Sequence, residues 1–218
     1  SSADIKNLSA ARVLCVGDVM LDRFVYGDVS RVSPEAPIPV CRVRDETSML
    51  GGAGNVVRNL AALGAEAIFI TVIGDDDAGA EIDGLISAQG NISPEIFRED
   101  NRRSTVKTRY VADGQQLLRA DRESEDDITD ELAQSVIERV RARLPEAGAV
   151  LLSDYGKGVL TDAVTAAIIE AAHAAGKPVI VDPKGVDYTR YRGASLLTPN
   201  RRELAEASFM KADGDAGI

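Results

Sequence analysis

Acidic, basic and amide side chains follow short apolar runs at several places along this sequence. In chain order they are Asp22, Asp154, Lys157, Asp182, Lys184, Asn200 and Glu203. Carboxylates accept hydrogen bonds from sugar hydroxyls, ammonium groups attract phosphate, and oxygen atoms are the ligands that Mg²⁺ prefers. These residue types therefore predict a site for a polyhydroxylated ligand that carries phosphate and is handled together with Mg²⁺.

A glycine-rich segment, GGAGN at 51–55, leads directly into a helix pattern. Its small residues and exposed amides would let a ligand approach the backbone closely, and a tight turn before a helix is the structural alternative. Two nucleotide-binding signatures fail. Val57 stands where the third glycine of GxGxxG belongs, and neither GKG at 156–158 nor GKP at 176–178 completes a GxxxxGK[ST] loop. A dinucleotide-dependent oxidoreductase is therefore disfavoured.

Several of these residues also have purely structural explanations. Asn200 with Glu203 matches a helix capping box, a role that is compatible with a helix N-terminus facing phosphate. The three aspartates at 75–77 are typical of a helix start rather than a metal site. The acidic run at 123–127 is typical of a solvated connection. Asp154 could be an ordinary acid at a strand end, and three further side chains could simply be solvated: Asp22, Lys157 and Lys184.

The elements that must position these residues are strands alternating with helices. Short apolar runs bounded by Gly, Asp or Pro predict buried strands at Arg12–Gly17, Glu66–Gly74, Ala149–Ser153, 178–182 and 194–198. Apolar residues at helical spacing predict helices over 53–63, 129–144 and 161–175. This alternation predicts an α/β fold with a mostly parallel sheet. Ligands bind beyond the carboxyl ends of such strands, where the polar residues above are found.

Two segments interrupt this alternation, residues 23–50 and residues 104–121. Both are polar and β-rich and lack a helix pattern, and residues 105–111 alternate as in a half-exposed strand. Asp113-Gly114 is a hairpin turn signal. These segments predict a small sheet that stands off the main one and serves as a lid or a dimer clasp.

The composition excludes several classes of protein. The 218 residues contain 25 Lys plus Arg against 35 Asp plus Glu, a formal charge of −10, which argues against nucleic acid or an anionic membrane as the main partner. No stretch approaches the about 18 apolar residues of a membrane helix. Cys15 and Cys41 fit no CxxC spacing and His173 is the single histidine. We therefore expect a reduced, cytoplasmic setting without a zinc site.

Several motifs together resemble a known enzyme family, the ribokinase-like (PfkB) carbohydrate kinases. They are Gly17 followed by Asp22, GGAGNVVRNLAALG at 51–64, GDDDAG at 74–79 and TPNRRE at 198–203. A second set is similar to the branch of this family that acts on D-glycero-β-D-manno-heptose 7-phosphate: RVSPEAPIPV at 31–40, QQLLRAD at 115–121, LLSDYGKGVL at 151–160 and VDPKGVDYTRYRGASLLTPN at 181–200. The resemblance implies a three-layer α/β kinase domain over residues 8–218, with 23–50 and 104–121 inserted as a β lid.

The resemblance also implies an activity and its residues. The family transfers the γ-phosphoryl group of ATP, with Mg²⁺, to a sugar hydroxyl, here the anomeric one, for ADP-heptose and lipopolysaccharide core synthesis. The expected substrate-binding residues are Asp22, Gly51, Gly52, Asn55, Asp154 and Lys157. The expected nucleotide- or phosphate-binding residues are Lys184, Asn200, Arg201, Arg202 and Glu203, and Glu203 is also the expected metal ligand. The two lysines are included because of their positive charge, and the other residues because of the resemblance. A homodimer through the lid strands is expected. Four basic residues are candidates for binding the 7-phosphate of the sugar: Lys107, Arg109, Arg119 and Lys157.

One family feature is missing from these 218 residues. The family carries a GAGD-type segment whose glycine amides cradle phosphate and whose Asp is the general base. DGDAG at 213–217 has the wrong order, and no apolar strand precedes it. We therefore expect the base to lie beyond Ile218, the nucleotide-binding C-terminal part to be absent, and the isolated polypeptide to be inactive. Two alternatives stay open: another ribokinase-like sugar kinase, and a non-catalytic sugar-binding or dimerisation module.

Overall fold

The computed structural model describes residues 8–208, and its body is a parallel sheet. The strands of this sheet are β1 (Arg12–Gly17), β4 (Glu66–Gly74), β5 (Ile92–Glu99), β8 (Ala149–Ser153), β9 (Val179–Asp182) and β10 (Leu196–Leu197). Their order is β10-β9-β8-β1-β4-β5, and every neighbouring pair is parallel. The predicted parallel α/β sheet is therefore confirmed.

The predicted strands agree with this sheet except at one edge and at β10. β1, β4 and β8 have the predicted bounds, and β9 begins one residue later than predicted. β10 is shorter than the predicted 194–198. β5 was not predicted, because its sequence ISPEIFRE contains charged residues and Pro94 instead of an apolar run. It lies at the edge of the sheet, where a proline is tolerated.

Helices cover both faces of the sheet. They are α2 (Ala53–Ala62), α3 (Asp77–Ser87), α4 (Asp130–Arg143), α5 (Asp162–Ala174) and α6 (Arg201–Ser208), with short 3₁₀ turns η1 (Leu8–Ala10), η2 (Leu144–Glu146) and η3 (Tyr188–Tyr191). Side-chain caps explain three helix starts: Asp76 before α3, Thr129 before α4 and Thr161 before α5 each accept a hydrogen bond from a first-turn N–H. The predicted helix start at 75–77 is confirmed.

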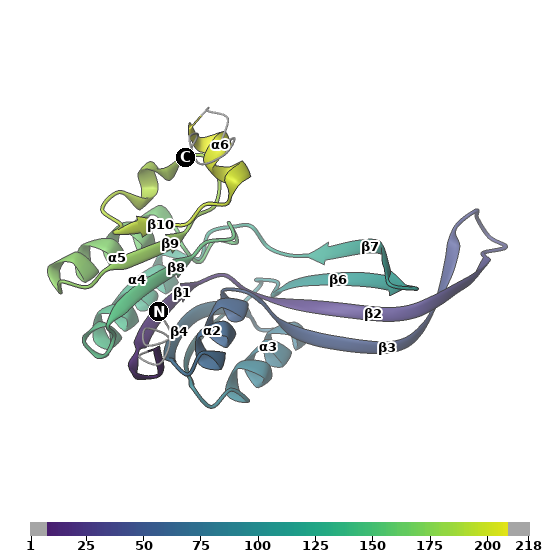
Figure 1. The fold of residues 1–218 in the computed structure, drawn as a ribbon, viewed down its shortest axis with the longest axis horizontal. Coiled ribbons are helices and arrows are strands. Elements are labelled where there is room, and N and C mark those ends of the chain that lie inside the picture. The colour runs from purple at the N-terminus through teal and green to yellow at the C-terminus, as the bar shows by residue number, and fades with distance from the viewer. Residues whose placement is uncertain (1–7, 209–218) are drawn as a thin grey trace.

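Two hydrophobic cores lie on opposite faces of the sheet. Leu14 and Val16 of β1 pack with α4 and α5, whereas Cys15 between them packs with α2 and α3. This alternation follows from the pleat of a strand, which points successive side chains to opposite faces. The result is the predicted three-layer arrangement, and each layer of helices is visible beside the sheet in Figure 1.

A second, four-stranded sheet, called the lid below, projects from the body (Figure 1). It consists of β2 (Val19–Val32), β3 (Pro39–Gly52), β6 (Thr105–Ala112) and β7 (Gln115–Arg122), in the order β3-β2-β6-β7. Asp113 and Gly114 join β6 to β7 with φ values of 50° and 77°, as a two-residue hairpin of type I′ requires. β2 and β3 extend beyond the predicted segment 23–50, to Val19 and Gly52, and the ends that join the body contain the buried residues Leu21 and Leu50.

The remaining predicted features are easily located. Cys15 is fully buried, which raises its thiol pKa to about 12, and Cys41 is half-buried on β3. His173 is exposed on α5. Within residues 8–208, no helix has the length and apolar character needed to cross a bilayer. The DGDAG segment at 213–217 lies outside the described residues.

Candidate functional site

Three strands of the body end at one level of the sheet. Gly17 of β1 is the register partner of Ser153 of β8, and Ser153 is the register partner of Asp182 of β9. Asp18 and Asp154 follow directly in the chain. The expected gathering of acidic residues at the carboxyl ends of the strands is therefore present.

Asp18 is a buried anchor for the loop that follows β8. Its carboxylate accepts hydrogen bonds from the backbone N–H groups of Tyr155 (2.8 Å), Lys157 (3.2 Å) and Val159 (3.1 Å). Its carbonyl accepts the N–H of Ala53 at the start of α2, at 2.9 Å. The side chain is almost wholly buried, and this burial, together with the charge of Asp154, raises its pKa although the three hydrogen bonds lower it. Asp18 thereby joins the β8 loop to the glycine-rich helix start.

Asp154 is also buried, and protein groups occupy both of its oxygens. The N–H of Gly156 donates to Oδ1 at 2.8 Å, and the hydroxyl of Tyr191 donates to Oδ2 at 2.7 Å. The guanidinium of Arg190 lies 3.6 Å from Oδ2. The Tyr191 hydroxyl also accepts the N–H of Lys184 at 3.1 Å, and burial raises the pKa of this tyrosine. Asp154 and Tyr191 therefore connect the loops that follow β8 and β9.

A cavity of about 260 Å³, called the carboxylate cavity below, lies at this edge of the sheet. Its wall consists of Asp154, Tyr155, Asp182, Pro183, Lys184, Thr198, Asn200 and Glu203. Burial and, after it, the charges of Glu203 and Asp154 raise the pKa of Asp182. Such mutual repulsion among carboxylates favours a bound cation. The predicted phosphate-side residues Lys184, Asn200 and Glu203 thus share one cavity.

The segment TPNRRE folds as the capping box that its spacing allows. Asn200 Oδ1 accepts the N–H groups of Arg202 and Glu203, each at 3.0 Å, and Glu203 Oε2 accepts the N–H of Asn200 at 2.9 Å. Arg201 and Arg202 are exposed, and Arg202 pairs with Glu206 at 2.7 Å. The structural explanation of this motif is therefore confirmed, and the first turn of α6 still faces the cavity through Asn200 and Glu203.

The predicted sugar-binding acid lies against the glycine-rich segment. A Cβ atom on Gly51 would lie only 2.3 Å from Oδ2 of Asp22, so only glycine leaves room for this carboxylate. Asp22 Oδ1 accepts a hydrogen bond from Nη1 of Arg109 at 2.5 Å, and both side chains are about one-fifth exposed. The lid therefore contributes a charged pair that borders the glycines.

Gly52 and Asn55 connect the same segment to the body. Gly52 has a φ of +56°, and its backbone passes so close to Asp18 that a Cβ would lie 2.4 Å from the Asp18 carbonyl oxygen. Asn55 lies in the first turn of α2, and its Oδ1 accepts a hydrogen bond from Arg58 at 3.0 Å. The strain-free turn that brings Asp18 and the start of α2 together thus depends on glycine.

Lys157 differs from the expectation of a solvated or ligand-facing lysine. Its ammonium lies 2.9 Å from Glu123 and 2.7 Å from Glu125. Glu123 also contacts Lys107, at 3.3 Å. Residues 123–127 form an irregular connection in which 125–127 are exposed, as expected, but Glu123 and Glu125 also pair with the basic residues that lie beside them in the folded chain.

Tyr155 belongs to the wall of the carboxylate cavity, whereas Asp22, Gly51 and Asn55 do not. Burial raises the pKa of Tyr155, and the charges of Asp182, Asp22 and Glu203 raise it further. Its position directly after an apolar run was the available sequence signal. Tyr191 had none, because its partner Asp154 is distant in the sequence.

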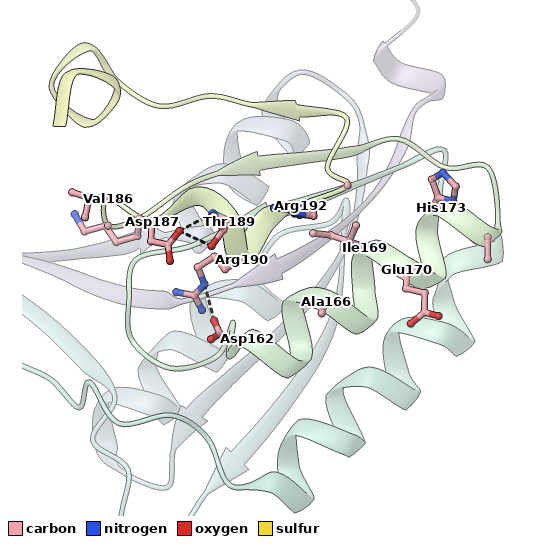
Figure 2. Close-up of a pocket in the computed structure, with 14 residues that line it drawn as sticks. Asp162, Ala166, Ile169, Glu170, His173, Val186, Asp187, Thr189, Arg190 and Arg192 are labelled. Atoms are coloured by element: carbon pink, nitrogen blue, oxygen red, sulfur yellow. Dashed lines mark hydrogen bonds and ion pairs between the residues drawn. The ribbon is translucent and has the colours of Figure 1, made fainter. Parts of the chain in front are cut away.

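A larger cavity, of about 890 Å³, lies elsewhere, between α5 and residues 184–193 (Figure 2). It shares Lys184 with the smaller cavity. Two charged groups on its wall pair with each other, Arg190 with Asp162 at 3.1 Å (Figure 2). The smaller cavity is lined by Asp154, Asn200 and Glu203 of the predicted residues and by Asp182, whose pKa is raised, and we therefore take it as the candidate site.

Carboxylates of the candidate site fit a magnesium ion that is shared with phosphate. In the part of the chain that the structure describes, no group of three or more His, Cys, Asp or Glu side chains could enclose a metal. Mg²⁺ at phosphate sites, however, takes only one or two protein carboxylates, with water and phosphate oxygens as its other ligands. Asp182 and Glu203 line the same cavity and repel each other, so they are the residues that could hold it.

The sequence matches known proteins over nearly its whole length. The profile described as pfkB family carbohydrate kinase matches residues 10–216. The Bifunctional protein HldE of Paramagnetospirillum magneticum is 55% identical over 214 residues, and that of Rhodospirillum rubrum is 56% identical over 211 residues. The alignments cover 98% and 97% of this chain but 44% and 42% of those proteins, so the chain spans less than half of their length.

Solved structures with the same fold include two sugar kinases. Arabidopsis thaliana ribokinase complexed with ribose and ATP has a TM-score of 0.67 at 20% identity, covering 95% of this chain and 65% of that chain. The tetrameric inhibited form of Escherichia coli phosphofructokinase-2 has a TM-score of 0.68 at 21% identity, and the match covers 90% of this chain and 64% of that chain. At these identities the similarity establishes the fold, and the predicted ribokinase-like α/β fold is confirmed.

Proposed function

Because this chain belongs to the pfkB family of carbohydrate kinases, we propose that it binds the sugar of an ATP-dependent kinase reaction on D-glycero-β-D-manno-heptose 7-phosphate. Transfer of the γ-phosphoryl group to the anomeric hydroxyl would give the 1,7-bisphosphate, a precursor for ADP-heptose and lipopolysaccharide core synthesis. The heptose-type motifs and the HldE relatives at 55% and 56% identity support this substrate.

The observation that carries the proposal is the fit of Asp22 against Gly51, where a Cβ atom would lie 2.3 Å from the carboxylate. Because Gly51 has no side chain, Oδ2 of Asp22 is left open on that side, and a carboxylate oxygen of this kind can accept hydrogen bonds from sugar hydroxyls. Gly52 and Asn55 would bring the backbone and an amide to the same sugar. The side chains of Asp154 and Lys157 already have partners within the protein. Their proposed contribution to substrate binding is indirect, through holding the loop after β8 in place.

The phosphate end of the reaction would lie in the carboxylate cavity. The groups proposed to meet the nucleotide phosphates are Lys184, Asn200, Arg201, Arg202 and Glu203. Asp182 and Glu203 would hold Mg²⁺, which supplies charge neutralisation for the transferred phosphoryl group. The chain's own contribution is positioning, since in-line phosphoryl transfer depends chiefly on orientation and electrostatics.

We further propose that residues 8–218 form an incomplete kinase domain that does not catalyse transfer alone. The proposal is supported by the absence of a GAGD-type segment from these 218 residues. The general base would then come from a segment outside this sequence. ATP-dependent formation of the heptose bisphosphate by the isolated polypeptide would contradict this part of the proposal.

The lid is proposed to mediate a homodimer. Its strands expose large apolar side chains, among them Tyr26 (40% exposed), Val43 (47%) and Leu118 (58%). Burying apolar surface on a second copy would remove it from water. Sedimentation equilibrium should give twice the chain mass, and Leu118→Asp should give the monomer mass; a wild-type monomer at all concentrations would contradict the proposal.

Substitution of Asp22 tests the proposed substrate. Isothermal titration calorimetry with the heptose 7-phosphate, ribose and fructose should show the tightest binding for the heptose phosphate. Asp22→Ala should weaken this binding about 10- to 100-fold, the loss expected for a charged hydrogen-bond partner. Asp45→Ala, which removes an exposed carboxylate from the same lid sheet, should leave it unchanged.

Three results would contradict the substrate proposal. Binding of ribose without the heptose phosphate would indicate another ribokinase-like sugar kinase. Binding of no sugar would indicate a module with another role. Equal loss of stability and affinity in Asp22→Ala would identify Asp22 as a structural residue.

A further inference from the structure

Four basic residues on or beside the lid could meet the phosphate of a phosphorylated sugar, and each of them has a carboxylate partner. Lys107 lies 3.0 Å from Asp121 and also contacts Glu123. Lys157 contacts Glu123 and Glu125. A phosphate dianion approaching either lysine would be repelled by the two carboxylates beside it. Arg119 Nε lies 3.0 Å from Asp121, which is not one of the predicted sugar-binding residues.

Arg109, on β6, differs in the carboxylate that it contacts, which is the predicted sugar-binding acid. Its single carboxylate partner among the described residues is Asp22, at 2.5 Å, and a long contact of 3.4 Å reaches the Lys107 carbonyl. Both contacts use Nη1, and Nε and Nη2 donate no hydrogen bond to a residue that the structure describes. A planar guanidinium can bind two anions in its plane at once, which an ammonium does with less directional control.

The orientation of Arg109 is fixed by its neighbours. Its guanidinium carbon lies 5.2 Å from the centre of the Phe24 ring, on the adjacent strand β2, within the range of a cation–π contact. The side chain is 22% exposed, so it is partly shielded from water but open to a ligand. Because Arg109 touches the carboxylate that borders Gly51, it lies at the end of the predicted sugar site nearest the lid.

A second arginine lies opposite Arg109 in the lid sheet, since Arg109 is the direct register partner of Arg119 on β7. Each of the two has its own carboxylate partner, Asp22 for Arg109 and Asp121 for Arg119. Arg119 is therefore a matched arginine that does not contact the predicted sugar-binding acid. The alternative cation on the body side, Arg58, donates to the amide of Asn55 and belongs to α2 rather than the lid.

We propose that Arg109 binds the terminal phosphate of a sugar phosphate whose hydroxyls Asp22 accepts, and that it thereby selects phosphorylated over unphosphorylated sugars. This inference rests on the proposed function, because it assumes that a sugar binds at Asp22. Arg109 would be a specificity-determining residue, and it takes no part in the transfer of the phosphoryl group.

The experiment measures a ratio of two affinities. The 218-residue chain is titrated with D-glycero-D-manno-heptose 7-phosphate and with the same heptose lacking phosphate, and the ratio of the two Kd values is the readout. Arg109→Ala should reduce the preference for the phosphorylated sugar about 10- to 100-fold, as expected for lost charge-assisted hydrogen bonds. Any indirect effect on Asp22 acts on both sugars and cancels in the ratio.

Two further variants control for charge and folding. Arg119→Ala removes the same charge from the neighbouring strand and should keep the wild-type ratio. Arg109→Lys keeps a cation beside Asp22 and should lower the ratio by an intermediate factor, so it replaces Arg109→Ala if that variant does not fold.

The outcomes separate this inference from the proposed function. A wild-type ratio in Arg109→Ala, or an equal fall in Arg119→Ala, would overturn the role of Arg109 and leave the sugar site intact. A fall in the ratio in Arg58→Ala alone would assign the phosphate to the body instead. Failure of the wild-type chain to bind either heptose would overturn the proposed function, and the inference with it.

Discussion

Gly51→Ala is the substitution that tests the geometry of the sugar-side residues most directly. The added Cβ would lie 2.3 Å from Asp22 Oδ2 and 2.9 Å from the Asp22 and Met20 Cγ atoms. Carbon and oxygen atoms in ordinary contact lie roughly 3.5 Å apart, so the carboxylate must move by about 1 Å. That movement breaks the 2.5 Å hydrogen bond between Asp22 and Arg109.

The expected loss of stability follows from two contributions. Overpacking of one methyl group costs about 1–3 kcal/mol. The charged hydrogen bond contributes about 1 kcal/mol, which is below the usual 1.5–3 kcal/mol because solvent screens this partly exposed pair. The sum is about 2–4 kcal/mol, or a decrease in Tm of about 5–15 °C for a chain of this size.

Urea unfolding and calorimetric titration with the sugar phosphate are the assays. Gly84→Ala serves as the matched control, since Gly84 is exposed in α3 and nothing lies within 4 Å of the added Cβ. This control should be about 0.5–1 kcal/mol more stable than wild type, because alanine favours a helix over glycine. Gly51→Ala should also lose sugar affinity, whereas Gly84→Ala should not.

A double-mutant cycle with Gly51→Ala and Asp22→Ala tests whether the cost at Gly51 comes from the Asp22 carboxylate. In the Asp22→Ala background the carboxylate is absent, so Gly51→Ala should cost only the contact with Met20, about 1 kcal/mol. The two substitutions should therefore couple by more than 1 kcal/mol. Additive effects would mean that the cost at Gly51 has nothing to do with the Asp22 carboxylate.

Two further predictions concern the carboxylate cavity. Tyr191→Phe removes the donor to Asp154 and the acceptor for the Lys184 N–H, so urea unfolding should show a loss of about 1–3 kcal/mol at unchanged slope, and a loss below 0.5 kcal/mol would disprove the connection. Burial, followed by the charges of Glu203 and Asp154, raises the pKa of Asp182, so the folded state binds the proton of this carboxyl more tightly than the unfolded state does. The free energy of unfolding therefore falls as the pH rises from the unfolded pKa of about 3.9 through the raised pKa of the folded state. Asp182→Asn should therefore stabilise the chain at pH 7 and have no effect near pH 3; a stabilisation that grows towards low pH would contradict this sign.

Local patterns predicted most of the elements because their causes lie within a few residues. The apolar runs of β1, β4 and β8 are continuous, and the Thr129 and Thr161 caps lie directly before their helices. The hairpin turn at Asp113-Gly114 depends only on the φ angles that these two residues adopt. β5 was missed for the same reason, since an edge strand with charged residues has no strong local pattern.

The sequence by itself determined which residue types gather at the carboxyl edge of the sheet, because a parallel α/β fold places every strand end there. Only the tertiary structure decided which of them pair. Arg109 contacts Asp22 across a separation of 87 residues, Tyr191 contacts Asp154 across 37, and Lys157 contacts Glu125 across 32. These partners meet because the strand order and the lid bring them together, and no periodicity or spacing along the chain encodes that order.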